Sequence, residues 1–264
     1  MPGLLYPVPH LPMLGKGSIL FDVFDANGNL TGAQHLGNCT KLELDIKDDI
    51  ATLFQSINKN VSLIASALKK REPSVSITGT DFSAAHMAIV MMSAGVVPLV
   101  GTVQTITAEA LASATATKHG KFFRTLNMNL DVSLPANTVV HQGGTALIQG
   151  TDYIISDPQL GLIYFPTASA VIDTTAVTVD YKTLVATNNQ VNGATQPYIK
   201  GKLTFDPDPT DGQKIALDIW QVNLNPNGAL GLIADDYGNW TLKGMILDST
   251  ASHPTAPYFQ ATFF

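Results

Sequence analysis

Residues 144–182 read GTALIQGTDYIISDPQLGLIYFPTASAVIDTTAVTVDYK and predict a series of short β-strands. Apolar side chains recur there at every second position, a spacing that puts them on one face of a strand. The residues in this pattern are Tyr153, Ile155, Leu162, Tyr164, Val177, Val179 and Tyr181. Turn-forming residues such as Asp157-Pro158 and Gly161 separate the runs. Because such strands bury one face against another sheet, we expect a small β domain over residues 119–186.

The chain on either side of this stretch also alternates strand-like and turn-like segments, without a clear break in composition. Residues 41–47 place apolar and charged side chains on opposite faces, which predicts a half-buried strand. Residues 84–92 are rich in Ala and Met and follow Ser83, a favourable N-cap, so we expect one helix there. Residues 102–118 fit either a short strand or a linker.

These patterns predict an all-β fold with one α-helix, in two domains. We expect a β-sandwich or barrel formed jointly by residues 1–118 and 187–264, into which the small β domain of residues 119–186 is inserted. Within the larger domain, residues 1–16 contain four prolines and predict an extended arm, and residues 48–74 predict a long loop. With 264 residues, of which 45% are hydrophobic, the chain can bury a core in each domain.

The charge of the chain restricts its partners. Only 14% of the residues are charged, whereas an average soluble domain has roughly 25%. A chain so poor in surface charge is expected to hide surface in an assembly. The net charge of -6 argues against a protein that grips the phosphate backbone of nucleic acid, because that grip needs clustered Lys and Arg.

The segment from residue 48 to residue 74 carries the candidate interface. Its strand pattern weakens from residue 48 to residue 72 although its apolar content stays high. A long loop of this composition is expected to contact a neighbouring subunit, because exposed apolar patches mark contact sites. The candidate inter-subunit residues are Leu53, Phe54, Ile57, Val61, Leu63, Ile64 and Leu68.

We identify no candidate catalytic, cofactor-binding or metal-binding residues in the sequence. Cys39 is the single cysteine, and the six histidines stand far apart. Asp206, Asp208 and Asp211 depart from a calcium loop, because the position that requires a bidentate Glu is occupied by Leu217. No Gly-x-Ser-x-Gly motif is present. We therefore expect a protein that is not an enzyme and that takes no cofactor.

The longest apolar run, residues 87–103, approaches the length of a short membrane span. Gly95 and Pro98 interrupt it, so we interpret it as a helix followed by a loop and expect no membrane partner. Residues 1–14 have no basic residue before their apolar positions and do not match a secretory signal.

Segments distributed along most of the chain together resemble the tail tube (major tail) proteins of tailed bacteriophages. The segments that resemble the amino-terminal half of these proteins are residues 15–22 (GKGSILFD), 25–29 (DANGN), 36–40 (LGNCT), Lys70-Arg71 and 81–84 (DFSA). The segments that resemble an extra β domain of some members are residues 150–153 (GTDY), 161–165 (GLIYF) and 179–181 (VDY). The segments that resemble the closing half are residues 202–205 (KLTF), Asp211-Gly212 and 225–232 (NPNGALGL).

The resemblance implies a structural virion protein. Six copies would join their sheets into a hexameric ring, and rings would stack into the hollow tail tube through which the genome is ejected. The implied partners are further copies of the chain, the tape measure protein, the tail terminator and the baseplate or tail-tip proteins. DNA would pass through the lumen without specific contacts. The implied location is the phage tail of the virion, after assembly in the host cytoplasm.

Two alternative functions remain open from the sequence. The first is another repeated structural protein, such as a capsid decoration protein or a component like a secretion needle. The second is a carbohydrate-binding adhesin module, which depends on Tyr237 and Trp240 beside Asp235-Asp236 as a sugar-binding face. In the competing interpretation these two aromatic residues belong to the start of a strand and to the core.

Overall fold

The computed structural model describes residues 14–56, 61–233 and 235–264. These residues form many β-strands and, within the described ranges, one α-helix, which confirms the predicted all-β class with one helix. They group into two units. Unit 1 combines Met1–Val96 with Val191–Phe264, and unit 2 consists of Val97–Gln190.

Unit 1 is built on an antiparallel sheet with the strand order β2-β1-β14-β15-β16-β4-β3. Its strands are β1 (Gly17–Val23), β2 (Gln34–His35), β3 (Cys39–Phe54), β4 (Leu63–Gly79), β14 (Ile199–Pro207), β15 (Ile215–Pro226), β16 (Trp240–Ile246) and β17 (Phe259–Phe263). On one side β15 pairs with two strands in turn, first with β17 and then with β16. The sheet therefore ends in the short strand β2 on one side and in the much longer strand β3 on the other.

The helix α1 (Ala84–Val90) begins where the sequence predicts. The Oγ atom of Ser83 accepts a hydrogen bond from the backbone N–H of His86 at 3.3 Å and so caps its first turn. The helix ends earlier than the expected residue 92, because the chain turns at Met92 with a φ of 52°. Its buried residues Ile89 and Val90 join the core of unit 1.

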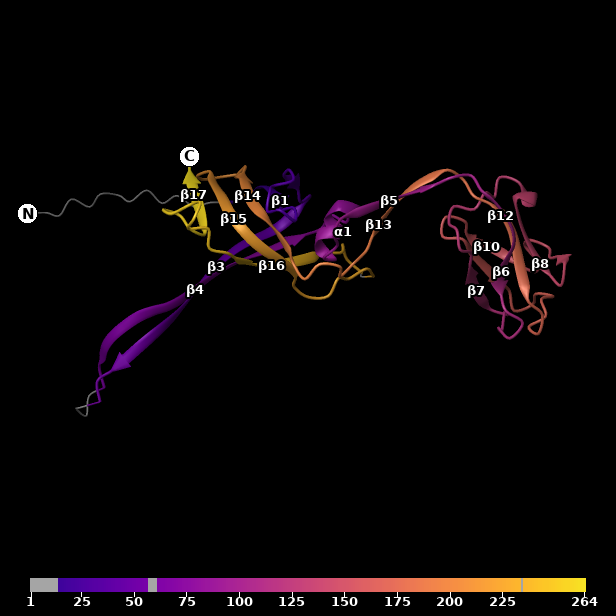
Figure 1. Ribbon diagram of the computed structural model, residues 1–264, viewed down its shortest axis with the longest axis horizontal. Helices are drawn as coiled ribbons and strands as arrows, with labels where there is room; N and C mark the ends of the chain where they lie inside the picture. Colours follow the sequence, from indigo (N-terminus) through magenta and orange to yellow (C-terminus); the bar gives the residue numbers. More distant parts are fainter. Residues whose placement is uncertain (1–13, 57–60, 234) are drawn as a thin grey trace, which may run out of the picture. The chain divides into compact units, whose positions relative to one another are not determined.

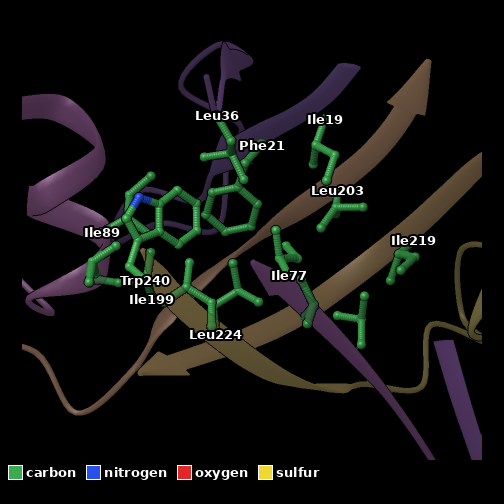
Figure 2. Close-up of a cluster of buried hydrophobic side chains, with 14 of the residues drawn as sticks. Ile19, Phe21, Leu36, Ile77, Ile89, Ile199, Leu203, Ile219, Leu224 and Trp240 are labelled. Carbon is green, nitrogen blue, oxygen red and sulfur yellow. The ribbon is translucent and has the colours of Figure 1, made fainter. Parts of the chain in front are cut away.

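The core of unit 1 is a cluster of apolar side chains from most strands of the sheet and from α1 (Figure 2). Figure 2 shows the indole of Trp240 beside Phe21, Leu36 and Ile89. Trp240 is almost fully buried, and its Nε1 donates a hydrogen bond to the backbone oxygen of Asp81 at 2.8 Å. The interpretation of Trp240 as a core residue is therefore confirmed.

Residues 48–74 do not form the loop expected from the sequence. They lie in β3 and β4, which pair with each other from Cys39↔Gly79 out to Phe54↔Leu63 and continue as a two-stranded ribbon (Figure 1). Polar residues interrupt the apolar alternation of both strands, so their sequence resembles a loop. Two register shifts, next to Asp49 and Leu53, disturb the pattern further.

The predicted half-buried strand over residues 41–47 is the first part of β3. Leu42 packs against the core, but Leu44 and Ile46 on the same face are exposed, so the expected buried face is wrong beyond Leu42. The helix and the rest of the core do not extend along β3 to cover these side chains.

Unit 2 has a core of its own between two sheets. One sheet has the strand order β6-β12-β8-β9 and the other the order β10-β11-β7. These strands are β6 (Thr105–Ala112), β7 (Lys121–Arg124), β8 (Thr138–Gln142), β9 (Thr145–Ala146), β10 (Ile154–Asp157), β11 (Leu162–Phe165) and β12 (Val177–Lys182). A separate pair, β5 (Val96–Gly101) and β13 (Ala186–Val191), lies where the chain passes between the units.

Burial in unit 2 follows the predicted alternation in one strand and not in another. In β12 the side chains of Val177, Val179 and Tyr181 are buried, as expected. In β11 the expected face is wrong, because Ile163 and Phe165 are fully buried while their neighbours are only partly covered. All four residues of β11 are apolar, so alternation cannot identify the inner face.

The boundaries of unit 2 differ from the expected residues 119 and 186. The unit begins at Val97 and ends at Gln190. The earlier start follows from β6, which forms the outer strand next to β12. The open choice between strand and linker for residues 102–118 is thus resolved in favour of a strand over Thr105–Ala112.

Candidate assembly surface

The outer part of the β3–β4 hairpin is the candidate functional surface of unit 1. We call residues 47–54 of β3 together with residues 63–72 of β4 the β3–β4 ribbon. Within β4, only Ser74–Gly79 pairs with β16, so the ribbon is held by β3 and β4 alone within the described structure. Its side chains are consequently open to solvent on both faces.

One face of the hairpin is apolar along most of its length. Alternate residues of β3 share this face, and their cross-strand partners lie beside them. The successive pairs are Leu42↔Ile77, Leu44↔Val75, Ile46↔Pro73, Asp48↔Arg71, Ile50↔Leu68, Thr52↔Ser66 and Phe54↔Leu63, of which Asp48↔Arg71 and Thr52↔Ser66 are polar. The face that is buried at the base of the hairpin therefore continues outward as an exposed apolar stripe.

The opposite face is charged near the base of the hairpin. Lys41 pairs with Glu43 at 2.9 Å between Nζ and Oε1, and Lys47 lies 3.6 Å from the Asp45 carboxylate. These ion pairs are exposed and contribute little to stability. They nevertheless keep this face hydrated, so the hairpin is amphipathic and its apolar face is the one suited to contact with another protein.

An ion pair interrupts the apolar stripe. The guanidinium of Arg71 donates two hydrogen bonds to the Asp48 carboxylate, from Nε to Oδ1 at 2.7 Å and from the second nitrogen to Oδ2 at 2.9 Å. These hydrogen bonds lower the pKa of Asp48 below its usual value and raise that of Arg71. The bidentate geometry links the two strands directly and helps to set their register.

The structure brings the sequence-predicted interface residues together on the outer half of the ribbon and its turn. Leu53, Phe54, Val61, Leu63, Ile64 and Leu68 are all exposed there. Ile57 lies outside the described residues. The sequence analysis missed Leu44, Ile46 and Ile50, which lie on the same face of β3 as Phe54 and extend the apolar stripe toward the sheet. The sequence could have indicated them, because apolar residues continue at every second position of β3 on both sides of the charged Asp48.

The edges of the sheet of unit 1 form a second candidate contact. β3 is an outermost strand with 16 residues, and in the described part of the chain β17 pairs with β15 alone. Their outer backbone N–H and C=O groups can pair with a strand of another chain. These two strands lie on the same side of β15, and each is able to pair with a strand of a neighbouring copy.

The aromatic residues proposed as a sugar-binding face do not lie together on the surface. Tyr237 is 91% exposed, whereas Trp240 is 2% exposed and hydrogen-bonded in the core. Trp240 is therefore not accessible to a sugar ring. Leu232 and Ile233 lie in the same loop as Tyr237 and are also exposed.

Acid–base and metal-binding groups are dispersed through the described parts of the chain. No group of three or more His, Cys, Asp or Glu side chains there could hold a metal ion. Burial raises the pKa of the Cys39 thiol to about 11, and the nearby Asp81 carboxylate acts in the same direction. The thiol is therefore protonated near neutral pH and is a poor nucleophile. No helix in the described ranges is long and apolar enough to cross a membrane.

The fold and this surface define a β-rich protein of two units, one of which exposes a long amphipathic ribbon. A family described as protein of unknown function UCP028589 matches residues 12–260. The match covers nearly the whole chain, so the protein belongs to this family. No curated protein matches the sequence.

Proposed function

We propose that the protein is a structural component that assembles with copies of itself into hexameric rings, which stack to form the tube of a phage tail. The observation that carries the proposal is the apolar stripe of the β3–β4 ribbon, which the rest of the described chain leaves uncovered. The resemblance of the sequence to tail tube proteins supplies the identity of the assembly.

The energetics of the ribbon favour an assembly with many identical contacts. Six side chains of the stripe, Leu44, Ile46, Ile50, Phe54, Leu63 and Leu68, are each 36% to 55% exposed. Covering the remaining area of one such side chain contributes about 1 kcal/mol. One ribbon alone gives a modest association energy, but six ribbons in a ring act together and hold successive rings firmly.

The sheet edges supply the contacts within a ring. Pairing the edge of one copy with that of the next continues the sheet, and closing the ring removes every free edge. The net charge of -6 suits a lumen through which DNA slides without being held. In this proposal the protein acts in the virion as a passive conduit and not as an enzyme, after assembling in the host cytoplasm with tape measure, terminator and baseplate or tail-tip proteins.

Sedimentation and negative-stain electron microscopy of the full-length chain test the proposal. We expect rings with sixfold symmetry, or tubes of stacked rings, with a population that increases with protein concentration. A protein that remains monomeric at every accessible concentration would contradict the proposal. Rings with another symmetry, or shells instead of tubes, would favour a different repeated structural protein.

A further inference from the structure

Unit 1 contains an apolar pocket at the carboxyl-terminal end of α1. Its volume is about 330 Å³. The residues that line it include Val90, Met91, Ala194, Pro226, Leu230 and Trp240. They come from the end of the helix and the residue after it, from the segment before β14, from the end of β15, from the loop that follows β15 and from the start of β16. An apolar cavity of about 150 Å³ is enough to hold a benzene ring, so this pocket is large enough for bulky apolar side chains.

The outer end of the β3–β4 ribbon offers side chains of this kind. Phe54 and Leu63 are directly opposite each other across the two strands. Each is more than half exposed, at 53% and 55%. They form a compact apolar pair at the position where the paired part of the ribbon ends.

The ribbon cannot place this pair in the pocket of its own copy. Trp240 lines the pocket and pairs with Gly79, whereas Leu63 is at the opposite end of β4. β4 has 17 residues, and at about 3.3 Å per residue it spans roughly 50 Å. Because the strand is hydrogen-bonded to β3 along this length, the two sites stay far apart in one copy.

Within the described structure, the ribbon carries a cation without an ion-pair partner, and the loop beside the pocket carries two exposed carboxylates. Lys69 lies six residues after Leu63 along β4, a distance of about 20 Å in a strand. No carboxylate in the described residues forms an ion pair with it. Asp235 and Asp236 are exposed on the loop that leads from Leu230 to Trp240. The five residues from Leu230 to Asp235 can span at most about 18 Å. A ribbon whose end reaches the pocket can therefore bring Lys69 near these carboxylates.

We propose that the pocket at the end of α1 receives Phe54 and Leu63 of a second copy. This inference rests on the proposed function and names the partner surface of the ribbon. Because donor and acceptor sites lie at opposite ends of β4, every copy both inserts a ribbon and receives one. Such a contact is heterologous, and it builds an open row when the rotation between successive copies does not close into a ring. Six of these rows side by side give rings stacked in one direction.

Cross-linking between copies tests the proposal. In a Cys39→Ala background, one preparation carries Leu63→Cys and a second, of different tag length, carries Ala229→Cys. Ala229 lines the pocket and is exposed. After mixing and treatment with a short bismaleimide, we expect a product that contains one chain of each kind. The matched control replaces the acceptor by Ala26→Cys, because Ala26 is an exposed alanine in a different groove of unit 1.

The outcomes separate this inference from the proposed function. If the mixture assembles but the product is no more abundant than with Ala26→Cys, the pocket is not the receptor, and only the inference fails. A product formed within one copy of a Leu63→Cys, Ala229→Cys double variant at high dilution also overturns it. If the chains never associate, the inference and the proposed function both fail.

Filling the pocket gives an independent measurement. Ala229→Trp places a large side chain in the pocket, and Ala26→Trp is the matched control. We expect Ala229→Trp to raise the protein concentration needed for stacking by at least about tenfold, because it prevents the burial of two large side chains. Its thermal unfolding should match that of the control. Equal stacking of the two variants would overturn the proposal.

Discussion

Gly79 faces the indole of Trp240 at the base of the β3–β4 hairpin, and the two residues are also paired across the strands. A Cβ atom at residue 79 would lie 2.3 Å from Cζ2 of the indole. The indole cannot move away cheaply, because its Nε1 is hydrogen-bonded to Asp81. The contact fixes the start of the ribbon against the core of unit 1.

Gly79→Ala should therefore destabilise unit 1. We expect a loss of about 1 to 3 kcal/mol in the free energy of unfolding, the usual cost of overpacking a core. Urea denaturation monitored by tryptophan fluorescence measures it. Gly231→Ala is the control, because a Cβ at residue 231 meets no atom within 4 Å. Equal unfolding free energies for the two variants would show that the indole can shift.

Charging the end of the ribbon should prevent assembly without unfolding the chain. In the variant Leu63→Asp with Ile64→Asp, both replaced side chains are exposed, so we expect the thermal unfolding temperature to stay nearly unchanged. Stacking should be lost, because a carboxylate cannot be buried without a partner. The matched control is Leu184→Asp with Val185→Asp, an exposed apolar pair in unit 2. Electron microscopy that shows normal tubes for the ribbon variant would exclude this end of the ribbon as an interface.

Acid should loosen the ribbon before it unfolds either core. The folded pKa of Asp48 is lowered by Arg71, so the ion pair is fully formed above the ordinary Asp pKa of about 3.9 and is lost as the pH falls through the folded value. We expect amide exchange in residues 47–54 and 63–72 to accelerate relative to the core over this range, after correction for the intrinsic pH dependence. Asp48→Asn should show the faster exchange already at neutral pH.

Asp45→Asn is the control for this effect. Its carboxylate is on the opposite face of β3 from Asp48 and lies 3.6 Å from Lys47, and among the described residues its only ion pair is this one within β3. We expect ribbon exchange in Asp45→Asn to match the unmodified chain at neutral pH. Equal acceleration in both variants would mean that net charge, and not the link between the strands, controls the ribbon.

Unit 1 should fold without unit 2, because the two buried clusters share no residue. We expect a chain with residues 97–190 replaced by a short Gly-Ser linker to unfold in one cooperative transition measured by circular dichroism. Deleting only residues 119–186 should be worse, because it leaves β6 exposed without β12. Aggregation of the first variant would show that unit 1 depends on unit 2.

Local patterns predicted the fold class because they depend on neighbouring residues. Ser83 begins the helix through a bond within one turn, and Val177, Val179 and Tyr181 face inward by simple alternation. β6 was harder to recognise, because two register shifts in its pairing with β12 and a positive φ at Ala108 disturb the alternation. Its assignment depends on pairing with a strand far along the chain.

The candidate surface was only partly predictable for a related reason. Six of the expected interface residues are exposed as the sequence indicated, since apolar content alone suggests a contact. The ribbon itself was not expected, because Asp48 and Arg71 break the apolar pattern in each strand separately. Their role becomes clear only when the two strands are paired, because the two side chains then form an ion pair. The sequence of either strand alone does not indicate this pairing.

The ion pair of Asp48 and Arg71 also affects the behaviour of a newly made subunit. A nonspecific contact with the apolar stripe would remove water from both ions without providing new polar contacts, so their desolvation cost would not be offset. Nonspecific association is therefore disfavoured. A partner surface that leaves the two ions hydrated or offers them polar groups does not incur this cost. In the proposed assembly, this penalty would favour addition of a subunit at a matched site over random association.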